Sequence, residues 1–430
     1  MTTWRQRLAR RAYSLLLRLL SPVYVLRLWW RGRAEPLYRH AMAERLGAYG
    51  GERSAGWVWV HAVSLGETRA AAALVDALRA LRPGLRLLLT HSTATGREAG
   101  LALLREGDRQ AWFPYDSTGV VKRFFAQFRP AVGILMETEV WPNLLRAAKR
   151  EGVPMVLANA RLSEKSQARG QRLDAVMRPA ACSLALVLAQ SEADAQRLRE
   201  AGATRVEVSG NLKYDLSPDA AQLAQGATWH GALNRPVVLA AITREGEEAA
   251  LLQAWVQQPA PRPLLLIVPR HPQRFDEVAA LVRSSGLTLA RRSGWIDTPS
   301  NADRAVDVWL GDSMREMSLY YGTAQVALLG GSFAPLGGHN LIEAAACGCP
   351  LVMGPSTFNF TEAAALSLAA GASARVPDVD HGVALALEWL ADPERLNRRA
   401  RDALRFAAQH RGAAHRMAER IAQLLPAQAA

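Results

Sequence analysis

The sequence predicts an α/β protein made of two domains, each built on a doubly wound parallel sheet. Its 430 residues exceed the ~250–300 at which a single hydrophobic core stops growing. Short apolar runs alternate with helical patterns, which indicates βαβ units. This alternation stops after Asp215 and restarts at Pro236, so we expect one domain on each side of the gap.

Five apolar runs in the first half predict strands that are buried on both faces. They are WVWV (57–60), LRLLLT (85–90), AVGILM (131–136), MVLA (155–158) and LALVLA (184–189). Helices are predicted between them by GETRAAAALVDALRAL, WPNLLRAAKR and SEADAQRLREAG. In the last of these, Ser191 is the expected N-cap and Gly202 the expected stop.

The second half repeats the pattern. Its predicted strands are PVVLAA (236–241), PLLLIV (263–268), DVWL (307–310), QVALL (325–329) and PLVM (350–353). We therefore expect an N-terminal helix (1–34), a Rossmann-like domain (35–215), a linker rich in Ala, Gln, Gly and Pro (216–235), and a second Rossmann-like domain (236–430). Two such domains are expected to face each other across a cleft, with ligands at the carboxyl ends of the strands.

The charge balance indicates an anionic partner. Lys and Arg number 52 against 39 Asp and Glu, a net charge of +13, which suits nucleic acid, acidic lipid or a phosphorylated sugar. Three cysteines without metal-ligand spacing argue against a disulfide framework and fit a reducing cytoplasm.

The basic excess is concentrated before Glu35, in a segment that also carries many leucines and the pair Trp29 and Trp30. Arg18 and Arg27 interrupt its apolar residues, so no run reaches the ~20 residues of a spanning helix. We expect a helix that lies in the interface of an anionic membrane. The alternative is a cationic helix packed on its own domain; nucleic acid is less favoured because no recognition motif accompanies the arginines.

The segment from Gly330 to Pro355 joins a predicted strand, a glycine-rich turn and a helix start near His339. Such a turn with free N–H groups predicts an anion site, although glycines also occur in plain βα connections. Asn340 and Glu343 lie three residues apart on the first helical turn, where both can face one ligand.

Polar residues also follow other strands. Glu67 opens a helix after the first strand and is either a helix cap or a general base. Glu137 and Glu139 are expected to point to opposite sides, with only one of them facing the cleft. The charges that follow other strands either bind a phosphate or carboxylate or are solvated surface groups, and they are Arg161, Lys213, Arg270 and His271.

Motifs for nucleotide–metal chemistry are missing from the sequence. It has no Walker loop, no G-x-G-x-x-G after the first strand, no HExxH and no Cys/His set. Asp378 and Asp380 form a D-x-D, which we interpret as a surface turn because no strong strand precedes it.

Seven motifs together resemble the 3-deoxy-D-manno-octulosonic acid (Kdo) transferases of Gram-negative lipopolysaccharide assembly. They are HAVSLGE, METEVWPN, NARLS, GNLKYD, VPRHPQRF, GDSMREM and GGSFAPLGGHNLIEA, and they span about residues 36–370 in order. The resemblance implies a GT-B fold and transfer of Kdo from CMP-Kdo to the 6' hydroxyl of a tetraacyl lipid A precursor. It further implies no metal or other cofactor, no nucleic-acid partner, and a place on anionic lipids at the cytoplasmic face of the inner membrane.

The same resemblance assigns roles to individual residues. It implies that Glu67 is the general base and that Glu137 and Lys213 stabilise the transition state. The implied CMP-binding residues are Pro269, Arg270, Arg315, Glu316, Met317, Asn340, Leu341, Ile342 and Glu343. Arg315 and Leu341 depart from the family pattern, which has glycine and proline there. The alternatives are another GT-B enzyme, such as a lipid A disaccharide synthase or a UDP-sugar epimerase, and a noncatalytic membrane-bound nucleotide-sugar sensor.

Overall fold

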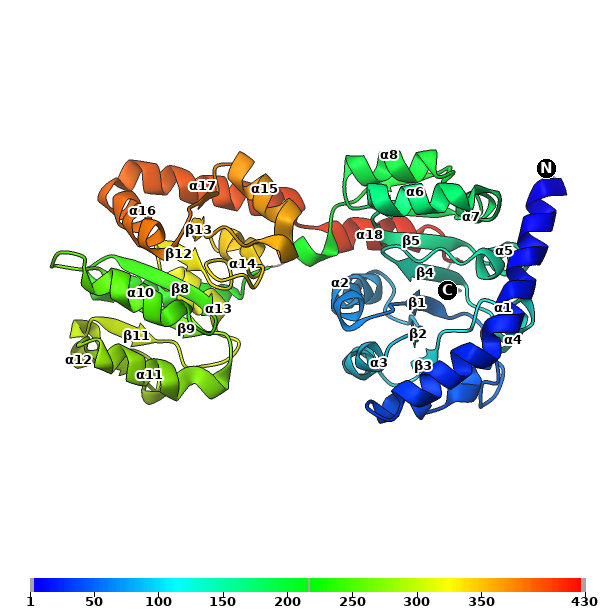
Figure 1. Ribbon diagram of the computed structural model, residues 1–430, viewed down its shortest axis with the longest axis horizontal. Helices are drawn as coiled ribbons and strands as arrows, with labels where there is room; N and C mark the ends of the chain where they lie inside the picture. Colours follow the sequence, from blue (N-terminus) through cyan, green and yellow to red (C-terminus); the bar gives the residue numbers. More distant parts are fainter. Residues whose placement is uncertain (1–3, 216, 427–430) are drawn as a thin grey trace. The chain divides into compact units, whose positions relative to one another are not determined.

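The computed structural model describes residues 4–215 and 217–426, which form two compact α/β domains (Figure 1). The N domain comprises residues 4–215 together with 412–426, and the C domain comprises residues 217–411. The chain therefore passes from the N domain into the C domain and returns.

The N domain is built on a seven-stranded parallel sheet with the order β3-β2-β1-β4-β5-β6-β7. Its strands are β1 (Val58–His61), β2 (Leu87–His91), β3 (Arg109–Trp112), β4 (Val132–Met136), β5 (Met155–Ala160), β6 (Leu186–Ala189) and β7 (Val206–Val208). Its helices are α1 (Trp4–Arg31), α2 (Leu65–Leu81), α3 (Ala94–Gly100), α4 (Thr118–Phe128), α5 (Pro142–Arg150), α6 (Glu164–Arg172), α7 (Asp174–Ala181), α8 (Glu192–Glu200) and α18 (Ala413–Ala422). Strand order reverses between β1 and β4, which makes the ends of these two strands the expected ligand position.

Successive residues of each strand in this sheet supply two core layers, because side chains alternate between its faces. Trp59 packs with Phe124 and Phe128 in one layer, whereas Val60 packs in the other. The second layer is closed by α2 and by α18, whose Met417 and Ile421 are fully buried.

The C domain has a second seven-stranded parallel sheet, with the order β10-β11-β9-β8-β12-β13-β14. Its strands are β8 (Val237–Thr243), β9 (Leu264–Pro269), β10 (Leu289–Arg291), β11 (Val308–Leu310), β12 (Val326–Leu329), β13 (Leu351–Met353) and β14 (Ser373–Arg375). Its helices are α9 (Ala220–Leu233), α10 (Glu247–Val256), α11 (Phe275–Ser284), α12 (Asn301–Ala305), α13 (Met317–Thr323), α14 (Leu341–Ala346), α15 (Thr361–Ala369), α16 (Val379–Ala391) and α17 (Pro393–His410). The order reverses between β8 and β12, so the glycine-rich segment after β12 lies at the switch point.

All ten predicted strands are present in the two sheets, with no bound shifted by more than two residues. The sequence interpretation missed four strands, β3, β7, β10 and β14. These four are the edges of the two sheets, and each has residues that are not buried. An edge strand does not need an uninterrupted apolar run, which is why the pattern did not reveal them.

The expected linker at 216–235 is wrong, because α9 occupies most of it and packs on α13 within the C domain. The contact is unusually close: a Cβ on Gly226 would lie 2.2 Å from the carbonyl oxygen of Leu319. Trp229 anchors the helix by edge-on contacts with Trp295 and Trp309. Alanine and glutamine are strong helix formers, so the composition that suggested a linker is also that of a helix with few apolar anchors.

The expected C-terminal bound at residue 430 also differs, because α18 belongs to the N domain. Asp215 of the N domain holds the start of α18. Its carboxylate accepts hydrogen bonds from the N–H groups of Gly412 and Ala414, both at 2.7 Å, at the start of α18.

Helix α1 is held to the N domain along one side (Figure 1). The Tyr13 hydroxyl donates to Asp116 at 2.9 Å, Ser14 donates to Asn143 at 2.9 Å, and Tyr24 stacks on Tyr115. The opposite side exposes a stripe of large apolar residues at helical spacing, namely Trp4, Leu8, Leu15, Leu19, Val23, Leu26 and Trp30. Among the described residues, none of the helices is long and apolar enough to cross a membrane.

Candidate active site

The N-domain site is built on the loops that follow β1 and β4. After β1 the chain turns through Ser64 into α2, and Glu67 lies in the first turn of that helix. Ser64 is the N-cap, and its hydroxyl accepts from the Glu67 N–H at 3.4 Å. The Glu67 carboxylate in turn accepts from the Val63 N–H at 2.8 Å and from the Ser64 hydroxyl at 3.1 Å. Glu67 is therefore fixed in the manner of a helix-capping residue while its side chain stays half-buried.

This environment holds a proton on Glu67 more strongly than water does. Burial raises the pKa of Glu67, and the negative charge of Glu137 raises it further, whereas the Val63 N–H, Ser64 and Lys213 act in the opposite direction. A carboxylate with a raised pKa is a stronger base than an ordinary one, which suits proton abstraction from a hydroxyl group.

Glu137 follows β4 and is buried, with 5% of its surface exposed. Its carboxylate forms two ion pairs, one with Lys213 Nζ at 2.8 Å and one with Arg161 Nε at 3.0 Å. Both cations are partly exposed, so the pairs connect a buried acid to the surface of the domain. From the sequence, Arg161 and Lys213 are either anion-binding residues or solvated surface charges. In the structure both form an ion pair with Glu137.

The loop that carries Lys213 is fixed by buried asparagines. Asn159 takes a left-handed backbone conformation (φ 51°) and its side-chain oxygen accepts from the Leu212 N–H at 3.0 Å. Asn211 caps the short turn Leu212–Tyr214 by accepting from the Lys213 N–H at 2.9 Å. These contacts position the partly exposed Lys213 against Glu137.

The expectation that only one of Glu137 and Glu139 lies in the site is wrong. Side chains two residues apart share one face of an extended chain, so strand alternation gives no reason to separate the two carboxylates, and the chain also leaves the extended conformation at Glu137 (φ 57°). Burial, together with the negative charges of Glu67 and Glu137, raises the pKa of Glu139 to about 7. Glu139 also accepts a hydrogen bond from the Trp141 indole at 2.7 Å. The N-domain site thus contains three interacting carboxyl groups, one more than the sequence indicated.

The C-domain candidates gather at the ends of β8, β9 and β12. Pro269 ends β9, and exposed Arg270 follows it, with its N–H donating to the Thr243 carbonyl at 2.9 Å. Burial, together with the positive charges of Arg270, Arg244 and His271, lowers the pKa of His339 to about 4. Four basic side chains from three loops therefore lie close enough to repel one another, as expected for a site that attracts an anion.

The glycine-rich turn (residues 330–338) does not offer the free N–H groups that the sequence predicted. The buried carboxylate of Glu247 accepts from the N–H groups of Gly331 (2.7 Å), Phe333 (3.1 Å) and Ala334 (3.2 Å). The N–H groups of Gly337 and Gly338 are bonded to Ser356 and to the Gly331 carbonyl. An internal carboxylate thus occupies the place expected for a ligand anion, and the basic side chains nearby supply the positive charge instead.

Helix α14 begins after Asn340, which is its N-cap and accepts from the Ile342 N–H at 3.1 Å. Leu341 and Ile342 are fully buried, so their side chains belong to the core and only their main chains are free to contact a ligand. Glu343 is half-buried, and burial raises its pKa. Of the four residues implied to bind CMP here, Asn340 and Glu343 are the ones whose side chains reach the surface.

The segment from Arg315 to Met317 leads into α13. Arg315 is exposed and left-handed (φ 65°), the conformation that glycine adopts most easily, and its carbonyl accepts from Gln222 at 2.9 Å. The Glu316 carboxylate is paired with Arg292 at 2.9 Å. The Arg315 side chain therefore points outward, while Glu316 already has a protein partner.

In the part of the chain that the structure describes, no group of three or more His, Cys, Asp or Glu side chains is placed to hold a metal ion. Asp378 lies at the surface in a bend, as expected, and it also has a structural role. It follows β14 and caps α16, with its carboxylate accepting from the His381 N–H at 2.9 Å.

Comparisons with known proteins agree with one another on the family. A family model for 3-deoxy-D-manno-octulosonic-acid transferase (kdotransferase) matches residues 40–216. The 3-deoxy-D-manno-octulosonic acid transferase of Bordetella pertussis is 47% identical over 95% of this chain and 98% of its own. That of Haemophilus influenzae is 34% identical over 81% and 83%. A UDP-GlcNAc 2-epimerase from Neisseria meningitidis shares the fold, at 16% identity and a TM-score of 0.54 over 85% of this chain and 99% of its own.

Proposed function

Because the chain belongs to the 3-deoxy-D-manno-octulosonic acid (Kdo) transferase family, a family of GT-B glycosyltransferases, we propose that it moves Kdo from CMP-Kdo to the 6' hydroxyl of a tetraacyl lipid A precursor. Kdo transfer in lipopolysaccharide biosynthesis is the activity of this family. The observation that carries the proposal is the N-domain group of Glu67, Glu137 and Lys213, in which a carboxylate of raised pKa lies near an acid–lysine pair.

We propose that the N domain binds the acceptor and that Glu67 is the general base. Its carboxylate takes the proton of the acceptor hydroxyl as that oxygen forms a bond to the anomeric carbon of Kdo. The bond from this carbon to the phosphate oxygen breaks on the opposite side, and CMP leaves with the electron pair, so the centre is inverted. Lys213, positioned by Glu137, offsets the negative charge that develops.

We propose that the C domain binds CMP-Kdo, whose carboxylate and phosphodiester are both anionic. Arg270 contacts the phosphate, supported by the positive field of Arg244 and His271. Asn340 and Glu343 contact the ribose or base through their half-buried side chains, and Leu341 and Ile342 contribute main-chain groups. Pro269, Arg315, Glu316 and Met317 complete the segments that line the nucleotide.

We propose that α1 attaches the enzyme to anionic lipid at the cytoplasmic face of the inner membrane. The exposed apolar stripe of α1 suits the acyl boundary, and its arginines suit lipid headgroups. A cavity of about 350 Å³ beside α1 is lined by Arg10, Arg146, Lys149 and Arg150 and by no acidic residue. Such a basic hollow adds to the attraction of phosphate headgroups.

Turnover with defined substrates tests the chemistry. Wild-type protein should convert CMP-Kdo and the purified tetraacyl precursor to a Kdo-bearing product detected by mass spectrometry, and CMP but not UDP should inhibit it. Glu67→Gln should lower kcat at least ~100-fold while CMP affinity is unchanged, because general-base catalysis contributes about 10²–10⁴-fold. Glu192→Gln is the matched control, since Glu192 also lies in the first turn of a helix but pairs with Arg199 at the surface.

Three outcomes contradict the proposal. Full activity in Glu67→Gln removes this residue from the mechanism. Inhibition by UDP rather than CMP favours another GT-B enzyme. Nucleotide binding without any turnover favours a noncatalytic sensor.

Membrane attachment is tested by replacing Trp4, Leu19 and Trp30 with serine together. These residues are exposed, so the fold should persist, whereas deletion of α1 would remove Tyr13 and Tyr24 from the domain. Sedimentation with anionic liposomes should fall for the variant, and wild-type binding should weaken with salt. Equal binding by the two proteins would contradict the role of α1.

A further inference from the structure

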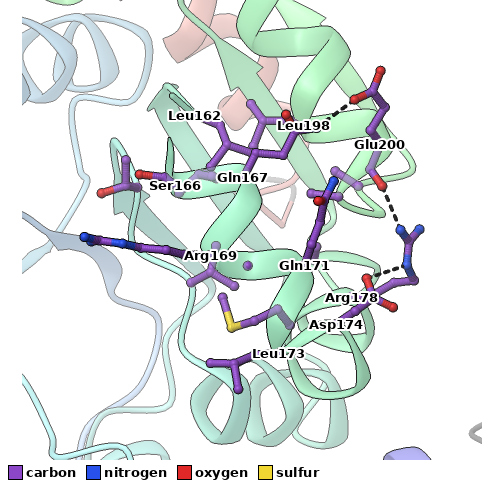
Figure 2. Close-up of a pocket in the computed structure, with 18 of the residues that line it drawn as sticks. Leu162, Ser166, Gln167, Arg169, Gln171, Leu173, Asp174, Arg178, Leu198 and Glu200 are labelled. Atoms are coloured by element: carbon purple, nitrogen blue, oxygen red, sulfur yellow. Dashed lines mark hydrogen bonds and ion pairs between the residues drawn. The ribbon is translucent and has the colours of Figure 1, made fainter. Parts of the chain in front are cut away.

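A second cavity of the N domain, of about 370 Å³, lies under α6 and between α7 and α8 (Figure 2). Its floor is apolar and belongs to the domain core, with Leu157, Leu184 and Leu198 all buried. Its rim is polar: Gln167 donates to Glu200 at 2.7 Å, and Arg178 donates to Asp174 at 2.9 Å. An apolar interior with a charged rim fits a ligand that has a long apolar part and a polar end.

The cavity and the carboxyl groups of the site share the same two loops. In the loop after β4, Thr138 and Val140 line the cavity, whereas Glu137 and Glu139 interact with Glu67. In the loop after β5, Leu162 lines the cavity and its neighbour Arg161 pairs with Glu137. A ligand with its polar end at the carboxyl groups therefore has an apolar hollow immediately beside it.

The cavity is also next to the proposed membrane face. Helix α7 separates it from the basic cavity beside α1: Met177 and Ala181 line the apolar cavity, while Val176 and Ala180 line the basic one. A chain drawn from a lipid layer at α1 would thus meet headgroup-binding cations on one side of α7 and an apolar hollow on the other.

We propose that this cavity holds one acyl chain of the lipid acceptor, an inference that rests on the proposed function. Its volume of about 370 Å³ corresponds to about 12 carbon atoms if each fills roughly the ~30 Å³ that a water molecule occupies. That is the size of one fatty-acyl chain, not of a whole acylated disaccharide. The cavity would therefore select acceptors by a chain near the reacting sugar and hold that sugar in place.

Helix α6 is the natural place to fill the cavity. None of its residues is buried, so the helix lies on the surface of the domain, where it covers the cavity. Gly170 lines the cavity one turn after Ser166, and a Cβ at Gly170 would meet no atom within 4 Å. A side chain can therefore start from Gly170 in open space, and Gly170→Phe should extend a ring into the cavity that this residue lines while replacing a poor helix former with a better one.

The test compares two acceptors with the full-length protein: the tetraacyl precursor and the same phosphorylated disaccharide with its acyl chains removed. Gly170→Phe should raise KM for the tetraacyl acceptor at least ~10-fold, since lost contact with two methylene groups weakens binding by about that factor. KM for the deacylated acceptor and for CMP-Kdo should stay unchanged, which also shows that the variant is folded. Gly231→Phe is the matched control, because Gly231 is an exposed helix glycine of the C domain with no neighbour within 4 Å.

The outcomes separate this inference from the proposed function. Unchanged kinetics of Gly170→Phe with the tetraacyl acceptor overturn it. An equal loss with both acceptors also overturns it, because that result reports distortion of the site and not exclusion of a chain. No transfer by the wild-type protein to either acceptor contradicts the proposed function itself, and the inference with it.

Discussion

Replacing Glu247 with alanine should release the glycine-rich turn of the C domain. The carboxylate is buried and accepts from four N–H groups: those of Gly331, Phe333 and Ala334, and that of Arg244 at 2.9 Å. Alanine removes every one of these acceptors at once. The turn then has no internal anion to hold it at the end of β12.

The expected cost follows from the burial of the orphaned groups. Each hydrogen bond to a charged group contributes about 1.5–3 kcal/mol, but four bonds to one carboxylate do not add independently. The Gly331 N–H is fully buried, whereas the other three residues are half-buried and can recruit water. We therefore expect a loss of about 3–5 kcal/mol, or roughly 6–20 °C in the Tm of a domain of this size.

Calorimetry of the full-length protein measures this change, and hydrogen exchange of residues 330–338 shows whether it is local. The Glu247→Gln variant should lose about half as much unfolding free energy as Glu247→Ala. Its amide keeps one acceptor oxygen for one pair of N–H groups but presents an NH₂ group to the other pair. Glu245→Ala is the control, since Glu245 is exposed and pairs only with its neighbour Arg244 in the described structure.

A Tm for Glu247→Ala within a degree of wild type, with unchanged exchange in the turn, would refute this reasoning. It would mean that the turn holds its shape by packing and glycine geometry alone. The affinity for CMP is a second measurement, and it should fall in Glu247→Ala because a released turn should displace the neighbouring His339 and Asn340.

Three further changes test other parts of the molecule. Burial raises the pKa of Glu139 from 4.5 to about 7, so between these pH values the folded protein keeps a proton that the unfolded chain releases. The free energy of unfolding should therefore fall by at most ~3 kcal/mol as the pH rises from 4.5 to 7. Glu139→Gln should reduce this fall, and urea unfolding at pH 5 and pH 8 checks it; an unchanged difference would show that Glu139 titrates normally. Asp215→Ala should cost about 1–2 kcal/mol and speed hydrogen exchange in α18, because the start of that helix loses its cap; unaltered protection of α18 would count against this. Gly226→Ala should destabilise the C domain by more than ~3 kcal/mol, because its Cβ would overlap the Leu319 carbonyl, whereas Gly231→Ala should be neutral or stabilising by up to ~1 kcal/mol; equal melting temperatures for the two variants would be the contrary result.

The sequence was most informative where strands are buried on both faces. Every central strand of both sheets contains a run of apolar residues, and Glu67, Glu137 and Arg270 come soon after such runs, whereas Lys213 follows the edge strand β7. The edge strands were missed because each has residues that are not buried, so it does not need a continuous apolar run. Helix α9 was missed because close glycine contacts and one tryptophan replace the usual apolar stripe.

Two features of the site could not be read from the sequence, for a common reason. The left-handed conformation of Glu137 occurs at a residue that gives no local sign of it, and the charge of Glu67 acts on Glu139 from a loop about 70 residues earlier in the chain. Glu247 follows β8, but its carboxylate accepts hydrogen bonds from a loop about 85 residues later in the chain. Both depend on contacts between segments that are distant in sequence, which local patterns do not encode.

The return of the chain to the N domain sets the order in which the protein can be completed. Asp215 and Gly412 are 197 residues apart, yet α18 is needed to cover α2 and one layer of the N-domain core. At ~5–20 residues per second, a ribosome needs about 10–40 s to make the intervening residues. During that interval the apolar layer that α18 later covers is exposed, which makes the emerging N domain prone to aggregation until the C domain has been made.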